Sequence, residues 1–570
     1  MRKIVDGNTA CSNIANLFTE IASIYPITPS SPMASNIDNL KLKKKNLFNE
    51  SVEVVEMQSE AGAAGAMHGA LISGSLATTF TASQGLLLMI PNMYKIAGEG
   101  LPGVIHVAAR TVATHALSIF GDHSDIYATR ATGFAILAST NVFDAQNLAA
   151  VAHLSAIEGR VPFLHFFDGF RTSHELNSIE ELPDEKLLGL INYDKVNAFK
   201  KQALNVGCAY QRGMAENEDI YFQSVEARNT DYDKIPDIVN DYMQKINGIM
   251  KTNYQPFNYY GSKNAKYVIV AMGSVCDTVK LTIEKLNETN DIYGLIEVHL
   301  YRPFSTKYLL EVLPSSVEKI AVLDRTKEAG SIGEPLYLDV VASLKDKDIK
   351  VVGGRFGLSS KNTTPSDIAG VYKMLETTLK DNFTIGILDD VTNLSLDKVP
   401  MDIKVADKEI LIYGYGSDGM VSTSKDIMHY LGEEKNLYVQ GYFQYDSKKS
   451  GGVTVSNLRI SSKEINAPYY VAHPSLLVIT KDAYLKDFDM FNNLKENGIC
   501  LINTNKKSHE LDDILPNKTK DIIKNRNIKV LLIDADKIAL ENNIKGKISK
   551  IMEIVILKLM GFNDAEDYIK

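Results

Sequence analysis

Cysteine is scarce in this chain: its 570 residues contain four, Cys11, Cys208, Cys276 and Cys500, and no two are close in sequence. This spacing excludes CxxC zinc ribbons and the cysteine runs that hold iron–sulfur clusters. So few thiols provide no disulfide framework and are typical of a reducing compartment. We therefore expect a cytoplasmic protein.

An excess of basic residues is also absent. The formal net charge is −9 and the sequence pI is near 5.8, which argues against a nucleic-acid-binding protein. The N-terminus has no continuous apolar run, so we expect no signal peptide. With 45 % hydrophobic and 23 % charged residues, the composition is typical of globular domains, and the length suggests three or four of them at about 150 residues each.

Formal charge is missing altogether between Glu60 and Lys95. The stretch is long enough to cross a bilayer, but it mixes glycine, proline, serine, threonine and amide residues too densely for a lipid-facing helix. We expect helices rich in glycine and alanine that pack against a buried parallel strand, and no membrane partner.

Strand-like and helix-like segments alternate along the chain. We expect strands at 75–83, 103–110 and 161–169, and helices at 83–100 and 141–159, with Ser83 as the N-cap of the first helix. This alternation predicts an α/β fold with mostly parallel sheets.

The predicted elements group into three consecutive α/β units. A polar stretch precedes a new apolar strand at 267–275, and a linker with Pro400 precedes another strand at 408–419. We therefore predict domains at 1–256, 257–400 and 401–570. The sequence shows no short-period repeat and no low-complexity tract.

A glycine-rich turn opens the third unit: Gly414-Tyr-Gly416-Ser417-Asp418-Gly419 follows a strand and precedes a helix. Such a turn can bind a pyrophosphate through backbone N–H groups. NAD would favour an acidic residue after the next strand, whereas this strand leads into Lys448-Lys449. The lysines favour a ligand with more phosphate than NAD, and a tight turn beside a solvated lysine pair stays an alternative.

Three polar residues of the first unit are candidates for ligand binding. Thr28 lies in the proline-rich segment Tyr25–Pro32, which predicts a rigid loop. Glu60 begins the uncharged stretch, and Arg110 ends a strand at the edge where doubly wound sheets bind ligands. Each alone is more often structural, but the combination suggests a site for a small carboxylate.

Familiar catalytic motifs are absent. The eleven histidines show no HExxH spacing, and the sequence contains no GxSxG elbow and no P-loop. His123 and the pair His165 and Asp168 are better interpreted as core or loop residues whose hydrogen bonds are made within the protein.

Long segments resemble the pyruvate:ferredoxin (flavodoxin) oxidoreductases. They include DGNTACSNIANLFTEIASIYPITPSSPMA, VVEMQSEAGAAGAMHGA, ALSIFGDHSDIYATR and PFLHFFDGFRTSHE in the first unit, VLDRTKEAGSIGEPLYLDV in the second and VQGYFQYDSKKSGGVTVSNLRIS in the third. The resemblance implies oxidative decarboxylation of pyruvate to acetyl-CoA and CO₂, with electrons passed to ferredoxin or flavodoxin. It further implies a pyrimidine-binding domain for thiamine diphosphate (TPP), a transketolase C-terminal-like domain and a gamma-type domain that binds coenzyme A (CoA).

The resemblance assigns roles to individual residues. It places Glu60 at N1′ of the TPP aminopyrimidine, where a shared proton favours the imino tautomer, and it makes Arg110 and Thr28 ligands of pyruvate. It implies a CoA site from the following residues: Gly416, Ser417, Asp418, Gly419, Lys448 and Asn503.

The chain also departs from the family pattern. It has no cluster cysteines and no GDG motif with a later Asn for Mg²⁺ and diphosphate, and Gly546-Lys547 replaces an Asn-Arg pair of the CoA site. We therefore expect Mg²⁺ and Fe–S clusters only through a partner chain, an isolated chain that is inactive, and a homodimer or higher assembly. Two alternatives stay open: a subunit of another 2-oxoacid:ferredoxin oxidoreductase, and a truncated remnant without activity.

Overall fold

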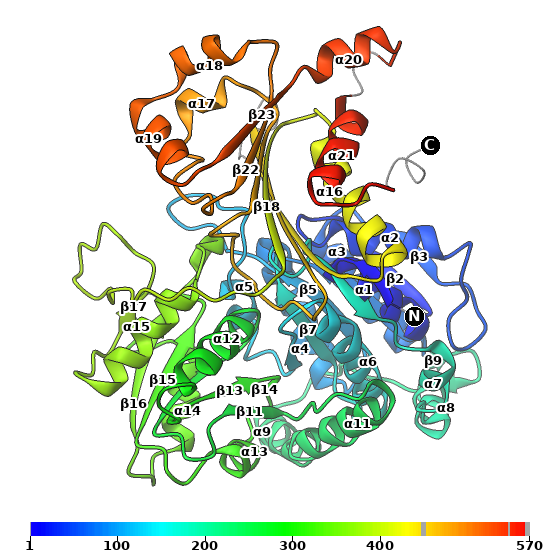
Figure 1. The fold of residues 1–570 in the computed structure, drawn as a ribbon. Coiled ribbons are helices and arrows are strands. Elements are labelled where there is room, and N and C mark those ends of the chain that lie inside the picture. The colour runs from blue at the N-terminus through cyan, green and yellow to red at the C-terminus, as the bar shows by residue number, and fades with distance from the viewer. Residues whose placement is uncertain (1, 446–451, 545–547, 565–570) are drawn as a thin grey trace.

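The computed structural model describes residues 2–445, 452–544 and 548–564, and three large β-sheets organise them (Figure 1). The fold is α/β with mostly parallel sheets, as predicted. Figure 1 shows the third sheet above the other two, with the last helices around its outer end.

The first sheet has seven strands, and six of them are parallel. In spatial order the seven strands are β14 (Leu300–Arg302), β6 (Ala135–Ala138), β7 (Phe163–Asp168), β5 (Val104–Ala109), β4 (Ala77–Thr81), β2 (Ile21–Ile24) and β3 (Glu53–Glu56). The antiparallel strand is β14, at one edge. All residues of β4, β5 and β7 are buried, as expected for central parallel strands that are covered on both faces.

Eleven helices belong to the described part of this first unit. They are α1 (Gly7–Phe18), α2 (Ser31–Leu40), α3 (Glu60–Ile72), α4 (Ser83–Gly98), α5 (Ser124–Ala128), α6 (Val142–Gly159), α7 (Asp184–Leu188), α8 (Tyr193–Lys201), α9 (Glu218–Ala227), α10 (Asn229–Tyr232) and α11 (Ile235–Met250). A short hairpin of β9 (Leu204–Asn205) and β10 (Cys208–Ala209) lies between α8 and α9.

The second sheet is parallel except for one edge strand, β11. Its order is β11 (Phe257–Gly261), β13 (Tyr293–Val298), β12 (Tyr267–Ala271), β15 (Lys319–Asp324), β16 (Lys350–Arg355) and β17 (Phe383–Thr384). The helices of this unit are α12 (Val275–Asn287), α13 (Thr306–Val312), α14 (Pro335–Ser343) and α15 (Pro365–Glu376).

The third sheet is mixed. Its order is β1 (Arg2–Val5), β8 (Leu176–Glu180), β19 (Tyr438–Tyr445), β20 (Val453–Ser461), β18 (Lys408–Tyr415), β21 (Leu476–Ile479), β22 (Ile499–Asn503) and β23 (Lys529–Ile533), of which the last four are parallel. The helices are α16 (Met420–His429), α17 (Tyr484–Asp487), α18 (Ser508–Ile514), α19 (Asn517–Asn525), α20 (Ala535–Glu541) and α21 (Ile548–Leu559).

Strands cross the boundaries that we predict between the units. β1 and β8 come from the first 256 residues but extend the third sheet, and β14 comes from the second segment but pairs with β6 of the first sheet. A sequence scan for local composition cannot detect such exchanges, because each depends on pairing between residues far apart in the chain.

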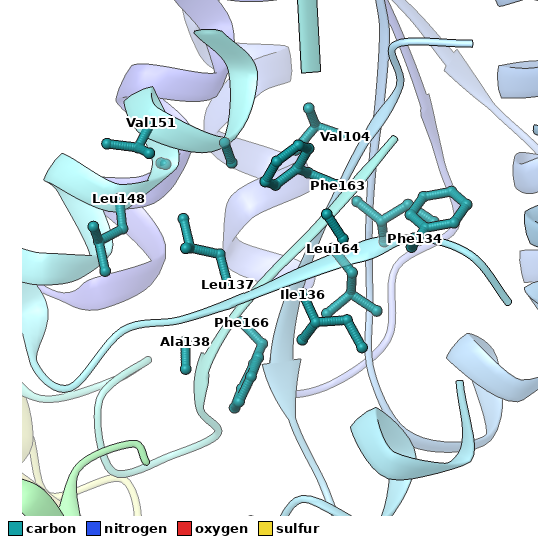
Figure 2. Close-up of a cluster of buried hydrophobic side chains, with 14 of the residues drawn as sticks. Val104, Phe134, Ile136, Leu137, Ala138, Leu148, Val151, Phe163, Leu164 and Phe166 are labelled. Atoms are coloured by element: carbon teal, nitrogen blue, oxygen red, sulfur yellow. The ribbon is translucent and has the colours of Figure 1, made fainter. Parts of the chain in front are cut away.

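Apolar side chains from the first sheet and α6 form a dense core (Figure 2). Leu148 and Val151 of α6 lie on the same side of the strands as Leu137 of β6, whereas Ile136 lies on the other side. Burial of each such side chain stabilises the fold by about 1.5–3 kcal/mol. The same core continues through Val268 and residues of the second sheet.

The uncharged stretch forms α3, β4 and α4, as the sequence analysis expects. Within the described ranges, no helix combines the length and apolarity that crossing a bilayer requires. One local prediction is wrong: the N-cap of α4 is Ala82, without a side-chain cap, and Ser83 is the first helical residue. Ser83 has a φ of 54° and its hydroxyl donates to the Thr111 carbonyl at 2.6 Å.

Candidate active site

Arg110 and Thr28 meet at the carboxyl edge of the first sheet. Arg110 directly follows β5, and its Nη1 donates to the backbone carbonyl of Thr28 at 2.8 Å. The Arg110 side chain is buried, and its Nε has no hydrogen-bond partner among the described residues. Thr28 itself is exposed. The pair therefore offers a guanidinium with unused donor capacity beside an accessible hydroxyl.

Glu60 is the first residue of α3, which the Ser59 side chain caps by accepting from the Gly62 amide at 3.0 Å. Only 7 % of Glu60 is exposed. No described residue donates a hydrogen bond to its carboxylate, and none forms an ion pair with it. Because a buried carboxylate normally has a donor, Glu60 is the strongest candidate for a ligand contact in this unit.

Gly85, in the first turn of α4, lies against Glu60. A Cβ at Gly85 would approach Glu60 Cγ and Thr81 Oγ1 to 2.7 Å each, so only glycine fits there. The buried Thr81 hydroxyl also has no partner in the described part of the chain. The start of α4 therefore brings a carboxylate and a free hydroxyl together at the edge that holds Arg110.

Asp125 connects the start of α4 with the end of β5, and it was not among the candidate residues from the sequence. Its buried carboxylate accepts from the backbone N–H groups of Ser83 at 2.7 Å, Arg110 at 3.0 Å and Ile126 at 2.8 Å. Burial raises the pKa of Asp125 to about 7, although these hydrogen bonds oppose the shift. Asp125 thus fixes the start of α4 relative to the end of β5. A lone Asp gives no sequence signal for this role.

We predict that Asp125→Asn flattens the pH dependence of stability. The folded pKa lies above the unfolded value of about 3.9, so the folded chain binds this proton more tightly and its stability falls as pH rises from about 4 to about 7. Removing the titration should lessen this fall by up to about 1.4 kcal/mol per pH unit. Urea unfolding at pH 5, 6 and 7 measures it. Asp324→Asn should have a similar effect, because burial also raises the pKa of Asp324 to about 7; unchanged slopes in both variants would contradict the prediction.

His123 and Asp168 form part of a buried ion network rather than an open site. His123 Nε2 lies 2.6 Å from Asp168 Oδ1, and Asp168 Oδ2 accepts from Arg325 Nη1 at 2.7 Å and from the Ser274 amide at 2.9 Å. Burial would raise the pKa of Asp168, but Arg325 and His123 outweigh it and hold the pKa well below its usual range. These contacts join the first two units. His123 is a core residue, as expected, but it is not fully hydrogen-bonded, because its buried Nδ1 has no partner among the described residues.

Three histidines far apart in sequence meet in the core. Ser139 Oγ, His165, His106 and His153 form a chain of hydrogen bonds of 2.8, 2.9 and 3.0 Å, with Cys11 Sγ 3.8 Å from His165 Nδ1. Burial lowers the pKa of His106 to about 3. All three hydrogen bonds can form between neutral imidazoles and the Ser139 hydroxyl. We therefore interpret the cluster as structural. Its sequence spacing gave no indication of it.

The glycine-rich turn of the third unit lies between β18 and α16, as predicted. Ser417 and Gly419 have φ values of 79° and 81°. The Asp418 carboxylate accepts from the amides of Tyr415 at 2.6 Å and Met420 at 2.9 Å. Asp418 therefore folds the turn, whereas Gly416, Ser417 and Gly419 form its outer surface.

Asn503 ends β22 at the same edge of the third sheet as this turn. Its Oδ1 accepts from the Ala535 amide at 2.9 Å and its Nδ2 donates to the Thr480 carbonyl at 3.3 Å. Asn503 thus links β21 and β22 to α20. Lys448, Lys449 and the Gly546-Lys547 pair lie outside the described residues.

Family profiles match most of the chain. Residues 14–244 match "Pyruvate flavodoxin/ferredoxin oxidoreductase, thiamine diP-bdg", residues 265–368 match "Pyruvate:ferredoxin oxidoreductase core domain II", and residues 409–570 match "Pyruvate ferredoxin/flavodoxin oxidoreductase". The full chain is 48 % identical to the pyruvate:ferredoxin oxidoreductase of Moorella thermoacetica and 47 % identical to the pyruvate-flavodoxin oxidoreductase of Klebsiella pneumoniae.

The chain belongs to the pyruvate ferredoxin/flavodoxin oxidoreductase family. It spans 49 % of the length of each of those two relatives. Among solved structures it is similar to 2-oxoglutarate:ferredoxin oxidoreductase from Magnetococcus marinus, with 16 % identity, a TM-score of 0.49 and 65 % of each chain covered. The candidate residues Thr28, Glu60 and Arg110 all lie within the family's thiamine diphosphate-binding region.

Proposed function

We propose that this chain provides the pyrimidine side and the substrate side of a TPP active site. The proposed reaction is oxidative decarboxylation of pyruvate to acetyl-CoA and CO₂, with electrons passed to ferredoxin or flavodoxin. The observation that carries the proposal is the buried Glu60 carboxylate, which has no hydrogen-bond donor among the described residues and lies at the sheet edge that holds Arg110.

The residues around Glu60 suit an aminopyrimidine. A ring nitrogen that carries a proton would satisfy the Glu60 carboxylate, and the missing side chain at Gly85 leaves room for the Glu60 side chain itself. The unpartnered Thr81 hydroxyl is a further polar contact. When bound, TPP supplies the nucleophilic carbon and the electron sink for decarboxylation. The role of Glu60 is to hold a proton at N1′ of the pyrimidine.

Arg110 and Thr28 suit the substrate end. We propose that Arg110 binds the substrate carboxylate through its unused N–H groups, and that the Thr28 hydroxyl binds a substrate oxygen. The hydrogen bond from Nη1 to the Thr28 carbonyl holds the guanidinium in place. Because a carboxylate beside a carbonyl occurs in every 2-oxoacid, these two residues also suit another 2-oxoacid:ferredoxin oxidoreductase. The names of the relatives favour pyruvate.

For the third unit we propose CoA as co-substrate. The amides of Gly416 and Asp418 donate to the carbonyls of Gly452 and Tyr415, at 2.9 Å each. We propose that the amides of Ser417 and Gly419 bind a CoA phosphate at the start of α16, where the helix dipole favours an anion. Lys448 and Lys449 follow β19, and we propose that they bind the 3′-phosphate of CoA. Asp418 and Asn503 act through the fold of the site, because their side chains are used within the protein.

We predict that the full chain binds CoA more tightly than dephospho-CoA and NAD. Loss of the 3′-phosphate removes the proposed ion pairs with Lys448 and Lys449, which costs about 1 kcal/mol, or roughly fivefold in Kd. The preference should shrink with added salt, because exposed charges are screened over about 8–10 Å. Calorimetric titration with the three ligands measures this. Lys448→Gln/Lys449→Gln should abolish the preference, whereas Lys518→Gln, on an exposed helix, should keep it.

We further propose that Mg²⁺, the diphosphate and the Fe–S clusters are held by polypeptide that corresponds to the rest of the relatives, either continuous with this chain or separate from it. The 570 residues alone should then release no CO₂ from pyruvate with TPP, Mg²⁺ and CoA, and should gain activity with the complementary polypeptide. A ¹⁴CO₂-release assay tests both. Turnover by the 570 residues alone would contradict the proposal that the active site needs further polypeptide. No turnover in the presence of the complementary polypeptide would favour an inactive remnant.

A further inference from the structure

A small cavity lies where the three units meet. It has a volume of about 30 Å³ and is lined by Arg171 of the first unit, Thr278 and Arg325 of the second, and Tyr442 of the third. Lys361 also lines it, so three cationic side chains surround it. Among the described residues, no carboxylate lines this cavity. Arg325 and Arg171 already pair with Asp168 and Glu175, so the excess positive charge at the walls is that of Lys361. This excess favours a negative ligand.

Arg171 has hydrogen-bonding capacity that the protein does not use. Its side chain is 6 % exposed, and its guanidinium lies 4.2 Å from the centre of the Tyr442 ring. Nη2 donates to the Tyr469 carbonyl at 3.2 Å and lies 3.3 Å from Glu175 Oε2. Nε and Nη1 are buried and have no acceptor in the described part of the chain. A buried guanidinium with two unpaired donor groups is costly unless another group accepts from them.

Thr278 is a second buried donor at the same cavity. It lies in the first turns of α12, where the helix dipole is positive. Thr278 is 1 % exposed, and its Oγ1 has no partner among the described residues. A helical threonine usually donates to the carbonyl four residues before it, as Thr282 does to Thr278 at 2.8 Å. The Thr278 hydroxyl therefore has a donor that no described residue uses.

We propose that this cavity is a binding site for a small inorganic anion of halide size. The anion would accept from Arg171 and from the Thr278 hydroxyl, near the positive end of α12. A volume of about 30 Å³ exceeds the 10–15 Å³ that a single water needs but is too small for a nucleotide or a CoA phosphate arm. The site is independent of the proposed catalytic function.

The anion would join the three units. Arg171 lies three residues after Asp168, the last residue of β7. Thr278 belongs to α12 of the second unit, and Tyr442 belongs to β19 of the third sheet. One ligand that touches residues of separate units stabilises their mutual arrangement by binding the folded state only. We therefore expect its signature in the thermal stability of the whole chain.

The test compares sodium bromide with sodium gluconate, a salt with an anion too large for the cavity, at equal ionic strength. Bromide should raise the Tm of the wild-type chain by a few degrees relative to gluconate. Thr278→Val should lose at least half of this difference. The control Thr282→Val, one turn further along α12, should keep it, because that hydroxyl is already bonded within the helix.

A crystal structure from bromide-containing solution completes the test. An anomalous peak within hydrogen-bond distance of Arg171 Nε or Nη1 and Thr278 Oγ1 is expected. No peak there, or a bromide-dependent Tm shift that is equal in the wild type and Thr278→Val, would overturn the proposal. If Thr278→Val does not fold, the presence or absence of the anomalous peak in the wild-type crystal decides whether the proposal holds.

Discussion

Glu60→Gln in the assembled enzyme should lower kcat for pyruvate oxidation by at least about 100-fold, which is the lower range for loss of a positioned proton-transfer group. Glutamine keeps the size of the side chain but cannot share a proton at N1′ as a carboxyl group does. The fold should persist, because no described residue bonds to the Glu60 carboxylate. Pyruvate-dependent CO₂ release in the presence of CoA and an electron acceptor measures the effect.

The matched control is Glu56→Gln. Glu56 ends β3 four residues earlier and is exposed, so its substitution should leave kcat within about twofold of the wild type, as for most surface changes. Thermal unfolding of both variants checks the fold. If Glu60→Gln retains wild-type activity, Glu60 is only a helix-start residue and its assigned role is wrong.

Arg110→Lys should reduce kcat/KM for pyruvate by roughly ten- to a hundredfold, or about 1.5–3 kcal/mol. Lysine keeps the charge but lacks the planar fork that binds a carboxylate and the Thr28 carbonyl together. Burial lowers the pKa of Arg110, although Asp125 opposes this shift. A lysine at this position would be deprotonated more easily, which adds to the loss.

Steady-state kinetics of the assembled enzyme test this prediction, with Arg130→Lys as the control. Arg130 is half-buried and lies beside Glu328, away from the candidate residues. Its substitution should leave kcat/KM unchanged. Unchanged kinetics in Arg110→Lys would show that Arg110 only supports the loop at Thr28.

The periodicity of apolar residues in the sequence was sufficient to predict the strands and helices that carry the candidate residues. The buried runs of β4, β5 and β7 and the helices α4 and α6 follow local patterns of apolar residues, and they lie where these patterns predict them. Arg110 at the end of β5 and Glu60 at the start of the uncharged stretch were recognisable because both are charged residues next to long apolar segments.

The contacts that complete the site were not predictable in this way. Asp125 binds the amides of Ser83 and Arg110, 42 and 15 residues away, and no local pattern encodes such a link. The expected N-cap role of Ser83 failed for the same reason, because its hydroxyl bonds to Thr111 across the sheet edge. The pairing of β1 and β8 with the third sheet likewise depends on the tertiary fold.

The most direct test of the central claim is an experimental structure of this chain assembled with its complementary polypeptide, TPP and pyruvate. We predict that the Glu60 carboxylate lies within hydrogen-bond distance of N1′ of the pyrimidine and that the Arg110 guanidinium binds the pyruvate carboxylate. A structure in which TPP binds away from Glu60, or in which another residue of this chain contacts N1′, would contradict the account.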